Sequence, residues 1–443
     1  MASTTLSITY SSAGNRDKWT WSGWVKRSKL GGHQSLWSRY ADSNNIGDLR
    51  FQSDDGFTYQ NYNNGSTNAQ WNASGKFRDT NAWYHIVFVW DSGNATAADR
   101  MKAYVNGEDM PGSASTTPSQ DLNSLINASA SHKIGSRNSD QYFDGLMSHV
   151  HFCDGYAYSP TDFGETDSTT GEWKIKTEPS VSYGTNGYFM FKDDASVNDD
   201  SGNDNDFTAS GTLTPTEDNP SNNFATMNPL HRGTTGFTNV VFKHGATTVD
   251  NNESGSGVYP VTFSSLAMSS GKFYCEMKVD SMSSSAVTIG IEEGRSDTIY
   301  GGKLSTGIAY KPNGEKRKND TSSSYGNTWT NSDIIGVALD LDNNYVYFSK
   351  NGTWQNSGDP TSGSSGTGGI AVESLSSTES GVYHFSVADN SSSGTSQVFM
   401  NFGNGYFGST AISSEGTNAS GIGKFEYDVP TGYTALSTKG LNE

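Results

Sequence analysis

Residues 83–90 read Trp-Tyr-His-Ile-Val-Phe-Val-Trp, an aromatic and β-branched run with the length of one strand. A turn sequence, Asp-Ser-Gly-Asn, follows at residues 91–94. Residues 101–105, Met-Lys-Ala-Tyr-Val, then alternate and meet Asn106-Gly107, which is the strongest short hairpin signal. These neighbouring segments predict antiparallel β-structure.

The second half of the chain repeats this unit. Residues 337–341 alternate, a turn follows at 342–344, and residues 345–348 form the return strand before Asn351-Gly352. No segment of a dozen residues keeps a helical apolar stripe. The predicted fold class is therefore all-β, with two antiparallel β-sandwich domains of the jelly-roll type in series.

The length of 443 residues exceeds what one hydrophobic core usually supports. Pro215, Pro220 and Pro229 lie close together among polar residues, a pattern that is incompatible with a central strand. We therefore predict a first domain at residues 1–214, a linker at 215–234 and a second domain at 235–443.

Composition and charge restrict the class of partner. Hydrophobic residues make up 33% of the chain and aromatic residues 12%, and there are 50 glycines, as in short strands joined by polar turns. The net charge of −18 argues against nucleic acid. No apolar stretch is long enough for membrane insertion, and no signal peptide is visible. Cys153 and Cys275 fall in different predicted domains, so we expect two buried free thiols.

The first half carries a recognisable order of motifs. A Trp-rich strand at residues 19–26 is followed by Trp-Tyr-His-Ile-Val at 83–87, Tyr-Val-Asn-Gly at 104–107, Ile-Gly at 134–135 and Phe-Asp-Gly-Leu at 143–146. Over about residues 5–210 this order resembles the laminin-G and pentraxin-like members of the concanavalin-A-like lectin/glucanase superfamily. The resemblance implies a jelly-roll of two curved sheets, a fold that hosts lectins, adhesins and hydrolases alike.

The second half carries a different set of motifs, at residues 271–277, 287–291, 306–310, 329–341 and 347–354. Their order and spacing resemble a SPRY domain over about residues 235–435. The resemblance implies a bent β-sandwich whose loops bind partners and which carries no catalytic residues.

Candidate catalytic and metal-binding residues are few. Glu292 and Glu293 are adjacent and point to opposite faces of a strand, and no paired-carboxylate run of the glucanase type occurs, so we expect no enzyme. His149 and His151 share one strand face, where a packed pair is the favoured interpretation over a metal site. Asp193, Asp199 and Asp204 are candidate Ca²⁺ ligands in an acidic run that also reads as an Asx and Gly turn.

Aromatic residues among amides and hydroxyls are the candidate binding residues, because sugars stack on aromatic rings while amides and carboxylates take their hydroxyls. We expect some of these rings to be core residues, and Trp329 to anchor the second core. The candidates are Trp37, Tyr40, Tyr59, Tyr62 and Trp71 in the first domain and Tyr300, Tyr310, Tyr325 and Trp354 in the second.

Two further stretches, at residues 220–230 and 427–436, resemble segments of virion proteins of marine tailed phages. With the two binding folds and the acidity, they imply a phage virion surface appendage, a tail or capsid fibre or decoration protein that adheres to host-surface glycans and docks on other virion proteins. No coiled-coil or β-helical repeat is present, although a homo-oligomer would gain avidity. A purely structural decoration protein, a polysaccharide hydrolase and a secreted adhesin are the alternatives.

Overall fold

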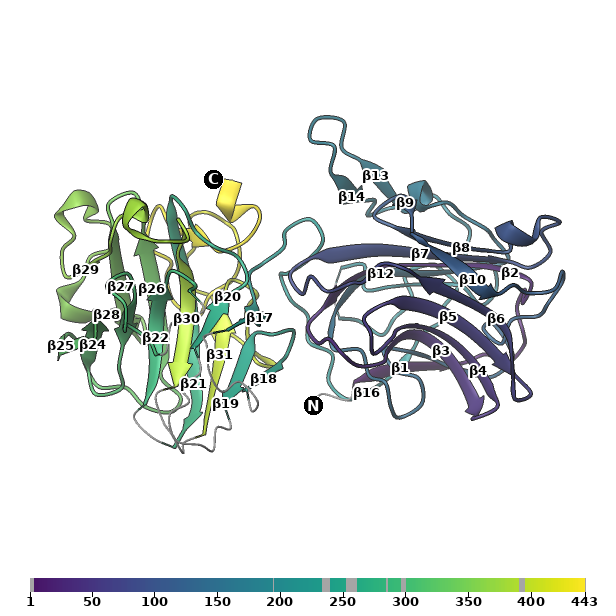
Figure 1. Cartoon of the computed structure of the whole chain (residues 1–443), viewed down its shortest axis with the longest axis horizontal. Helices are drawn as coiled ribbons and strands as arrows, with labels where there is room; N and C mark the ends of the chain where they lie inside the picture. Colours follow the sequence, from purple (N-terminus) through teal and green to yellow (C-terminus); the bar gives the residue numbers. More distant parts are fainter. Residues whose placement is uncertain are drawn as a thin grey trace. The chain divides into compact units, whose positions relative to one another are not determined.

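The computed structural model describes residues 4–193, 195–232, 240–251, 261–283, 286–295, 300–389 and 395–442. In these residues the structure is strands, loops and short 3₁₀ turns without an α-helix, which confirms the predicted all-β class (Figure 1). The chain divides into two compact units, residues 1–215 and 216–443. No helix in the described part is long and apolar enough to cross a membrane. The 3₁₀ turns are η1 (Ala97–Asp99), η2 (Pro160–Asp162), η4 (Gln355–Ser357), η5 (Gly363–Ser365), η6 (Leu375–Ser377) and η7 (Gly440–Asn442).

The first unit contains two large antiparallel sheets. The eight-stranded sheet has the order β10 (Gly112–Thr116), β6 (Ser66–Ala73), β5 (Phe57–Asn63), β4 (Asn45–Phe51), β3 (Gln34–Asp42), β11 (Ser131–Ile134), β1 (Thr5–Thr9), β16 (Thr208–Ser210). The six-stranded sheet has the order β15 (Tyr188–Met190), β12 (Gly145–Asp154), β2 (Lys18–Arg27), β7 (Trp83–Asp91), β8 (Met101–Val105), β9 (Glu108–Asp109). A separate ribbon joins β13 (Gly164–Thr166) to β14 (Trp173–Ile175).

The predicted hairpin of the first unit forms as its sequence indicates. Asn106 and Gly107 both have positive φ, 50° and 86°, and they connect β8 to β9. Only Asn, Asp and Gly adopt such angles readily, which is why this dipeptide marks the turn. The core between the two sheets is rich in aromatic residues: the Trp19 ring lies 5.5 Å from Tyr59 and 6.3 Å from Trp90.

Histidines of the six-stranded sheet are packing residues. His85 is stacked between Trp24, at 4.9 Å, and Trp173, at 5.9 Å, and Trp173 Nε1 donates a hydrogen bond of 3.0 Å to His85 Nδ1. Burial lowers the pKa of His85 to about 3, so this ring stays neutral. His151 is buried against Phe189 and the Tyr183 hydroxyl. The His149 ring lies 5.4 Å from the Phe189 ring and 6.4 Å from the His151 ring, and these contacts agree with the packed interpretation of His149 and His151.

The second unit is also built from two large sheets. The seven-stranded sheet has the order β17 (Met227–Arg232), β20 (Val261–Ser264), β30 (His384–Asp389), β22 (Val287–Glu292), β23 (Ile308–Tyr310), β24 (Glu315–Lys318), β25 (Thr321–Ser324). The nine-stranded sheet has the order β18 (Val240–Lys243), β19 (Thr248–Asn251), β31 (Ser396–Asn401), β21 (Lys272–Met282), β26 (Ile334–Asp340), β27 (Tyr345–Lys350), β28 (Thr353–Trp354), with β29 (Ile370–Ala371) beside β27 and β34 (Thr434–Ala435) parallel to β21. A small ribbon pairs β32 (Tyr406–Phe407) with β33 (Thr410–Ala411).

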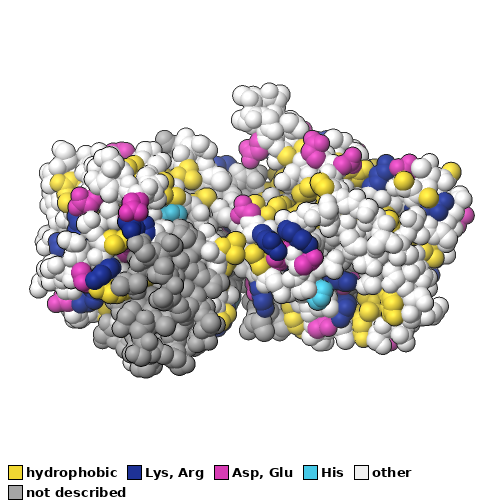
Figure 2. Space-filling view, viewed as in Figure 1, with side chains coloured by type: hydrophobic (Ala, Val, Ile, Leu, Met, Phe, Trp, Pro, Cys, Tyr) yellow, Lys and Arg dark blue, Asp and Glu magenta, His cyan; other side chains and the backbone are white. Residues whose placement is uncertain are grey.

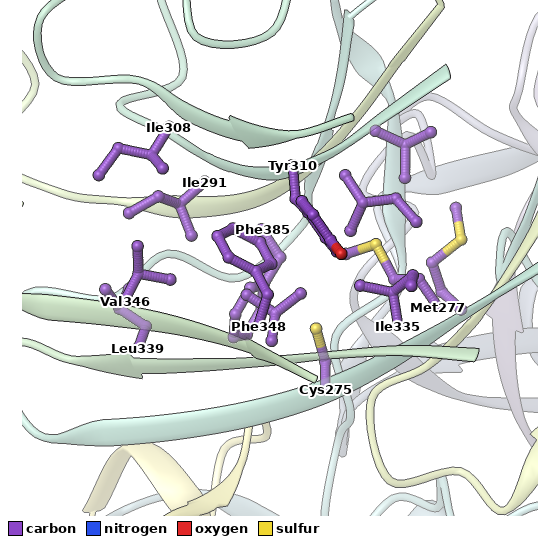
Figure 3. Close-up of a cluster of buried hydrophobic side chains, with 14 of the residues drawn as sticks. Cys275, Met277, Ile291, Ile308, Tyr310, Ile335, Leu339, Val346, Phe348 and Phe385 are labelled. Atoms are coloured by element: carbon purple, nitrogen blue, oxygen red, sulfur yellow. The ribbon is translucent and has the colours of Figure 1, made fainter. Parts of the chain in front are cut away.

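The core of the second unit lies between these sheets. Figure 3 shows Ile291, Ile308 and Phe385 of one sheet facing Leu339 and Phe348 of the other. Trp329 is 3% exposed and belongs to this core, as expected from the sequence. Cys275 of this core and Cys153 of the first unit are buried free thiols, which confirms that prediction.

The prediction of a linker at residues 215–234 is wrong for most of that stretch. Phe224, Ala225 and Met227 are buried in the cores of the second unit, and β17 pairs with β20. Pro229 lies inside β17, which is the edge strand of its sheet, and a missing N–H is tolerated at an edge. The second unit therefore begins before its predicted start at residue 235.

Candidate functional site: a polar sheet face and an aromatic-cation cluster

Three of the predicted binding residues of the first unit lie in its core. Trp37 and Tyr59 are 0% exposed and Trp71 is 5% exposed. The register Trp37–Leu49–Tyr59–Trp71 runs across β3, β4, β5 and β6, and opposed residues of a sheet share one face. The assignment of Trp37, Tyr59 and Trp71 as ligand-binding residues is therefore wrong, because this row faces the other sheet.

Tyr40 and Tyr62 lie on the opposite face of the same strands. The register Tyr40–Ile46–Tyr62 places both rings on one face, on either side of Ile46. Both tyrosines are half-buried, and the Tyr62 hydroxyl donates to the carbonyl of Gly65 over 2.9 Å. The structure thus brings together two of the five predicted aromatic residues on an outer face of the sheet.

Two rows of polar residues cross the strands beside these tyrosines. One row is Ser38, Asp48, Gln60 and Gln70, and the other is Ser35, Arg50, Thr58 and Asn72. These two rows together with Tyr40 and Tyr62 are called the polar face below.

Hydrogen bonds between side chains fix the geometry of the polar face. Arg50 donates to Asp48 over 3.0 Å and to the Gln60 side-chain oxygen over 3.2 Å. Gln70 Nε2 donates to Asn72 Oδ1 over 3.1 Å, which also accepts from the Thr58 hydroxyl over 2.9 Å. Such a network holds amide and hydroxyl groups in place before any ligand arrives, which reduces the entropy that binding costs.

A loop at residues 136–142 covers one end of the polar face. The carbonyl of Ser136 accepts from the Ser38 hydroxyl over 2.7 Å, and the Arg137 guanidinium lies 5.9 Å from the Tyr40 ring centroid. Asp48 is fully buried, and burial raises its pKa although Arg50 and Ser35 act in the opposite direction. At the other end Gln60, Gln70 and Asn72 are half-buried and the neighbouring strand β10 is exposed. The open part of the face therefore presents uncharged amides.

Two of the four predicted residues of the second unit are core residues. Tyr310 is 0% exposed and donates to the carbonyl of Asn327, and Tyr325 is 7% exposed and accepts from the amide of Phe348. The assignment of Tyr310 and Tyr325 as ligand-binding residues is therefore wrong. Trp354 is half-buried at the end of β28, edge-on to Tyr274 at 6.3 Å.

Tyr300 is the fourth predicted residue and belongs to a half-exposed cluster. The Arg317 guanidinium lies 4.8 Å from its ring centroid and the Lys303 ammonium 5.2 Å from it. The Tyr300 hydroxyl and Lys303 both bond to the carboxylate of Asp320, at 2.5 Å each. This arrangement presents a guanidinium and an aromatic ring beside the basic strand β24.

The three predicted Ca²⁺ ligands do not form a cluster in the described part of the chain, where no group of three or more His, Cys, Asp or Glu residues could hold a metal ion. The Asp199 carboxylate accepts hydrogen bonds from the amides of Phe189 and Ser201 and from the amide of Asn205. Asp193 and Asp204 are exposed. Asp199 thus organises an Asx turn, which is the second interpretation of this acidic run. Calcium binding stays a prediction.

Comparison with protein families identifies both units. Residues 2–162 match the model of the concanavalin A-like lectin/glucanases superfamily, and residues 272–385 match the model of the SPRY domain. The chain carries a concanavalin A-like domain followed by a SPRY domain. Both resemblances stated from the sequence are confirmed. Domains of these two kinds are binding or scaffold domains rather than typical enzymes, and they fit a carbohydrate-binding or adhesion role.

Solved structures give only distant likenesses. The SPRY domain of human HERC1 is 14% identical, with 39% of this chain and 96% of that chain covered and a TM-score of 0.29. The native heptameric SAP-like pentraxin from Limulus polyphemus is 19% identical, with 36% and 73% covered and a TM-score of 0.27. No curated protein sequence matches the chain.

The polar residues of the concanavalin A-like domain were missed from the sequence. Residues 57–62 read Phe-Thr-Tyr-Gln-Asn-Tyr, and alternation alone separates Tyr59 from Gln60 and Tyr62. That signal was present for β5. Asn64-Gly65 is a hairpin signal that pairs β5 with β6 and so brings Gln70 beside Gln60. The alignment of Asp48 in β4 with Gln60 is given by the register of the structure.

Proposed function

We propose that the chain is an adhesion protein whose concanavalin A-like domain binds a neutral glycan through the polar face. The observation that supports the proposal most is the pair of ordered polar rows beside Tyr40 and Tyr62. A sugar offers hydroxyls that both donate and accept hydrogen bonds, and amides such as Gln60 and Gln70 can do both in return.

The internal charge balance of the face favours an uncharged ligand. Asp48 pairs with Arg50 at 3.0 Å, and Arg137 pairs with Asp140 at 3.1 Å. On the described surface visible in Figure 2, Lys and Arg side chains are interspersed with Asp and Glu side chains. A neutral polysaccharide needs no counter-charge on such a face.

The same rows favour binding over hydrolysis. Glycoside hydrolases use two carboxylates on either side of the scissile bond. In the two polar rows, all of whose residues the structure describes, the one carboxylate is Asp48, which is buried and paired with Arg50. We therefore propose a binding protein that is not an enzyme.

The double substitution Gln60→Ala/Gln70→Ala tests this function. Each neutral hydrogen bond is worth about 0.5–1.5 kcal/mol, so the loss of both amides is expected to weaken glycan binding about 10- to 100-fold. Binding of the full chain to a glycan array and to host-surface polysaccharide measures the effect. Gln120→Ala, an exposed residue outside the polar face, is the matched control and keeps binding. Unchanged binding by the double variant at unchanged melting temperature would refute the role of the face.

The setting that we propose for this adhesion is the surface of a phage virion, docked on other virion proteins. The proposal rests on the resemblance of residues 220–230 and 427–436 to virion protein segments. Mass spectrometry and antibody labelling of purified virions test it, and absence of the protein from intact particles would contradict it. Virions that lack the protein but adsorb normally would favour a purely structural role instead.

A further inference from the structure

One exposed aromatic ring stands apart in the first unit. Tyr156 is 41% exposed and is the only large hydrophobic residue of that unit so exposed among the residues that the structure describes. It lies in the loop 155–159 that follows β12, on the six-stranded sheet. The polar face belongs to the other sheet, so Tyr156 is not part of it.

The ring of Tyr156 is backed by a second ring. It stacks on Tyr158 with a centroid distance of 5.5 Å and an interplanar angle of 14°. Tyr158 in turn meets Phe163 edge-on at 6.0 Å, and Phe163 is 2% exposed. A scattered surface aromatic is ordinary in proteins, but a flat ring supported from the core outward is a rigid platform.

Hydrogen bonds hold this loop to strand β2. The Gly155 amide donates to the carbonyl of Lys18 over 3.0 Å, and the Thr20 hydroxyl donates to the carbonyl of Tyr156 over 2.9 Å. The same hydroxyl accepts from the Tyr158 amide over 2.9 Å, and the Tyr158 hydroxyl accepts from the amide of Ser182 over 2.8 Å. The platform is thus ordered before any ligand binds, which lowers the entropy cost of stacking.

Polar groups border the loop. The Asn15 side-chain oxygen accepts from the amides of Asp17 and Lys18, while Asn15 Nδ2 has no hydrogen-bond partner among the described residues. A Cβ on Gly155 would stand 4.0 Å from that Nδ2 atom. The Lys18 side chain is 41% exposed, and its ammonium pairs with the Asp91 carboxylate at 3.4 Å. An amide donor and an ion pair therefore border the loop that carries the two rings.

We propose that Tyr156 and Tyr158 form a second carbohydrate-binding site that stacks one pyranose ring on Tyr156, with Asn15 donating to a sugar hydroxyl. A protein partner would need a surface of about 800 Å² with several anchors, whereas this is one isolated ring with a polar border. A pyranose has one apolar face and a rim of hydroxyls, which matches that size and chemistry. The inference rests on the proposed glycan-binding function, and it adds a contact on the other sheet.

Two sites in one domain would raise affinity for a surface that carries many glycan chains, because the second contact becomes intramolecular. The experiment measures binding of the full chain to the immobilised polysaccharide selected by the array, and to a short oligosaccharide of it. Tyr156→Ala is expected to lower the apparent affinity for the immobilised polysaccharide about tenfold. Tyr156→Phe, which keeps the ring, and Tyr156→Trp are expected to retain it.

The outcomes separate this inference from the proposed function. If Gln60→Ala/Gln70→Ala loses binding while Tyr156→Ala binds both ligands like the wild type, the second site is refuted and the polar face stands. If Tyr156→Ala alone loses binding, the proposed binding role of the polar face is refuted and the aromatic site is supported. If neither variant loses binding, the inference is overturned. The melting temperature of each variant checks that Tyr156→Ala acts on binding and not on folding.

Discussion

The substitution Trp37→Ala is expected to lower the free energy of unfolding of the concanavalin A-like domain by about 3–5 kcal/mol, whereas Tyr62→Ala lowers it by less than about 1 kcal/mol. The Trp37 ring is fully buried and contacts His132 at 5.2 Å and Tyr188 at 5.1 Å. Its loss leaves a cavity between the sheets. Tyr62 is half-buried on the outer face, so its removal opens no such cavity.

Calorimetry of the full chain measures this difference in the free energy of unfolding. The two domains need not unfold as one two-state unit, and calorimetry can resolve a separate transition for each. The transition that Trp37→Ala moves is assigned to the first domain, and Tyr62→Ala is the control from the same sheet. The glycan-binding assay gives the opposite expectation: Tyr62→Ala weakens binding while folded Trp37→Ala retains it. Equal destabilisation by both variants would contradict the assignment of the two faces.

The stability of the SPRY domain is expected to fall as the pH rises from about 4.5 to about 8. Glu292 is 0% exposed, and burial raises its pKa from 4.5 to about 8, with the nearby charge of Glu293 acting in the same direction. The folded state therefore keeps a proton that the unfolded state releases near pH 4.5. The stabilisation is fully present below pH 4.5 and is lost as the pH passes through 8, by about 5 kcal/mol.

Glu292→Gln removes the contribution of Glu292 to this slope, because an amide does not titrate, whereas buried Glu276 of the same domain, whose pKa is raised from 4.5 to about 7, still titrates in the variant. Denaturant unfolding is measured between pH 5 and pH 9. The free energy of unfolding of the SPRY domain is expected to change less with pH in the variant than in the wild type. Thr288→Val is the matched control, since Thr288 is a buried neighbour on the same strand whose hydroxyl has no partner in the described residues. An increase in the free energy of unfolding of the wild-type SPRY domain from pH 5 to pH 8 would refute the prediction.

The strand pattern could be read from the sequence because turn chemistry is local. Asn106-Gly107 and Asn351-Gly352 adopt the positive φ angles that a tight hairpin needs, so the flanking strands follow. The aromatic residues were harder to assign. Tyr59 and Tyr62 lie three residues apart among the same polar neighbours, yet one faces the core and the other the outside.

Tertiary pairing decided the features that local patterns left open. Pro229 indicated a linker, but an edge strand accepts proline, and burial of Phe224 and Met227 draws this stretch into the SPRY core. The polar face depends on the alignment of four strands, and that alignment is not contained in any one segment. The sequence does not identify Tyr156 as a binding residue. Its exposure and its stack on Tyr158 depend on a loop that a hydrogen bond from Thr20 of β2 holds in place.

A crystal structure of the full chain with the oligosaccharide selected by the glycan array tests whether the polar face binds the glycan. We expect a sugar on the outer face of the eight-stranded sheet, with hydroxyls bonded to Gln60 and Gln70 and a ring against Tyr62. A sugar bound elsewhere, with the polar face empty in a crystal where that face is free of neighbouring molecules, would contradict it.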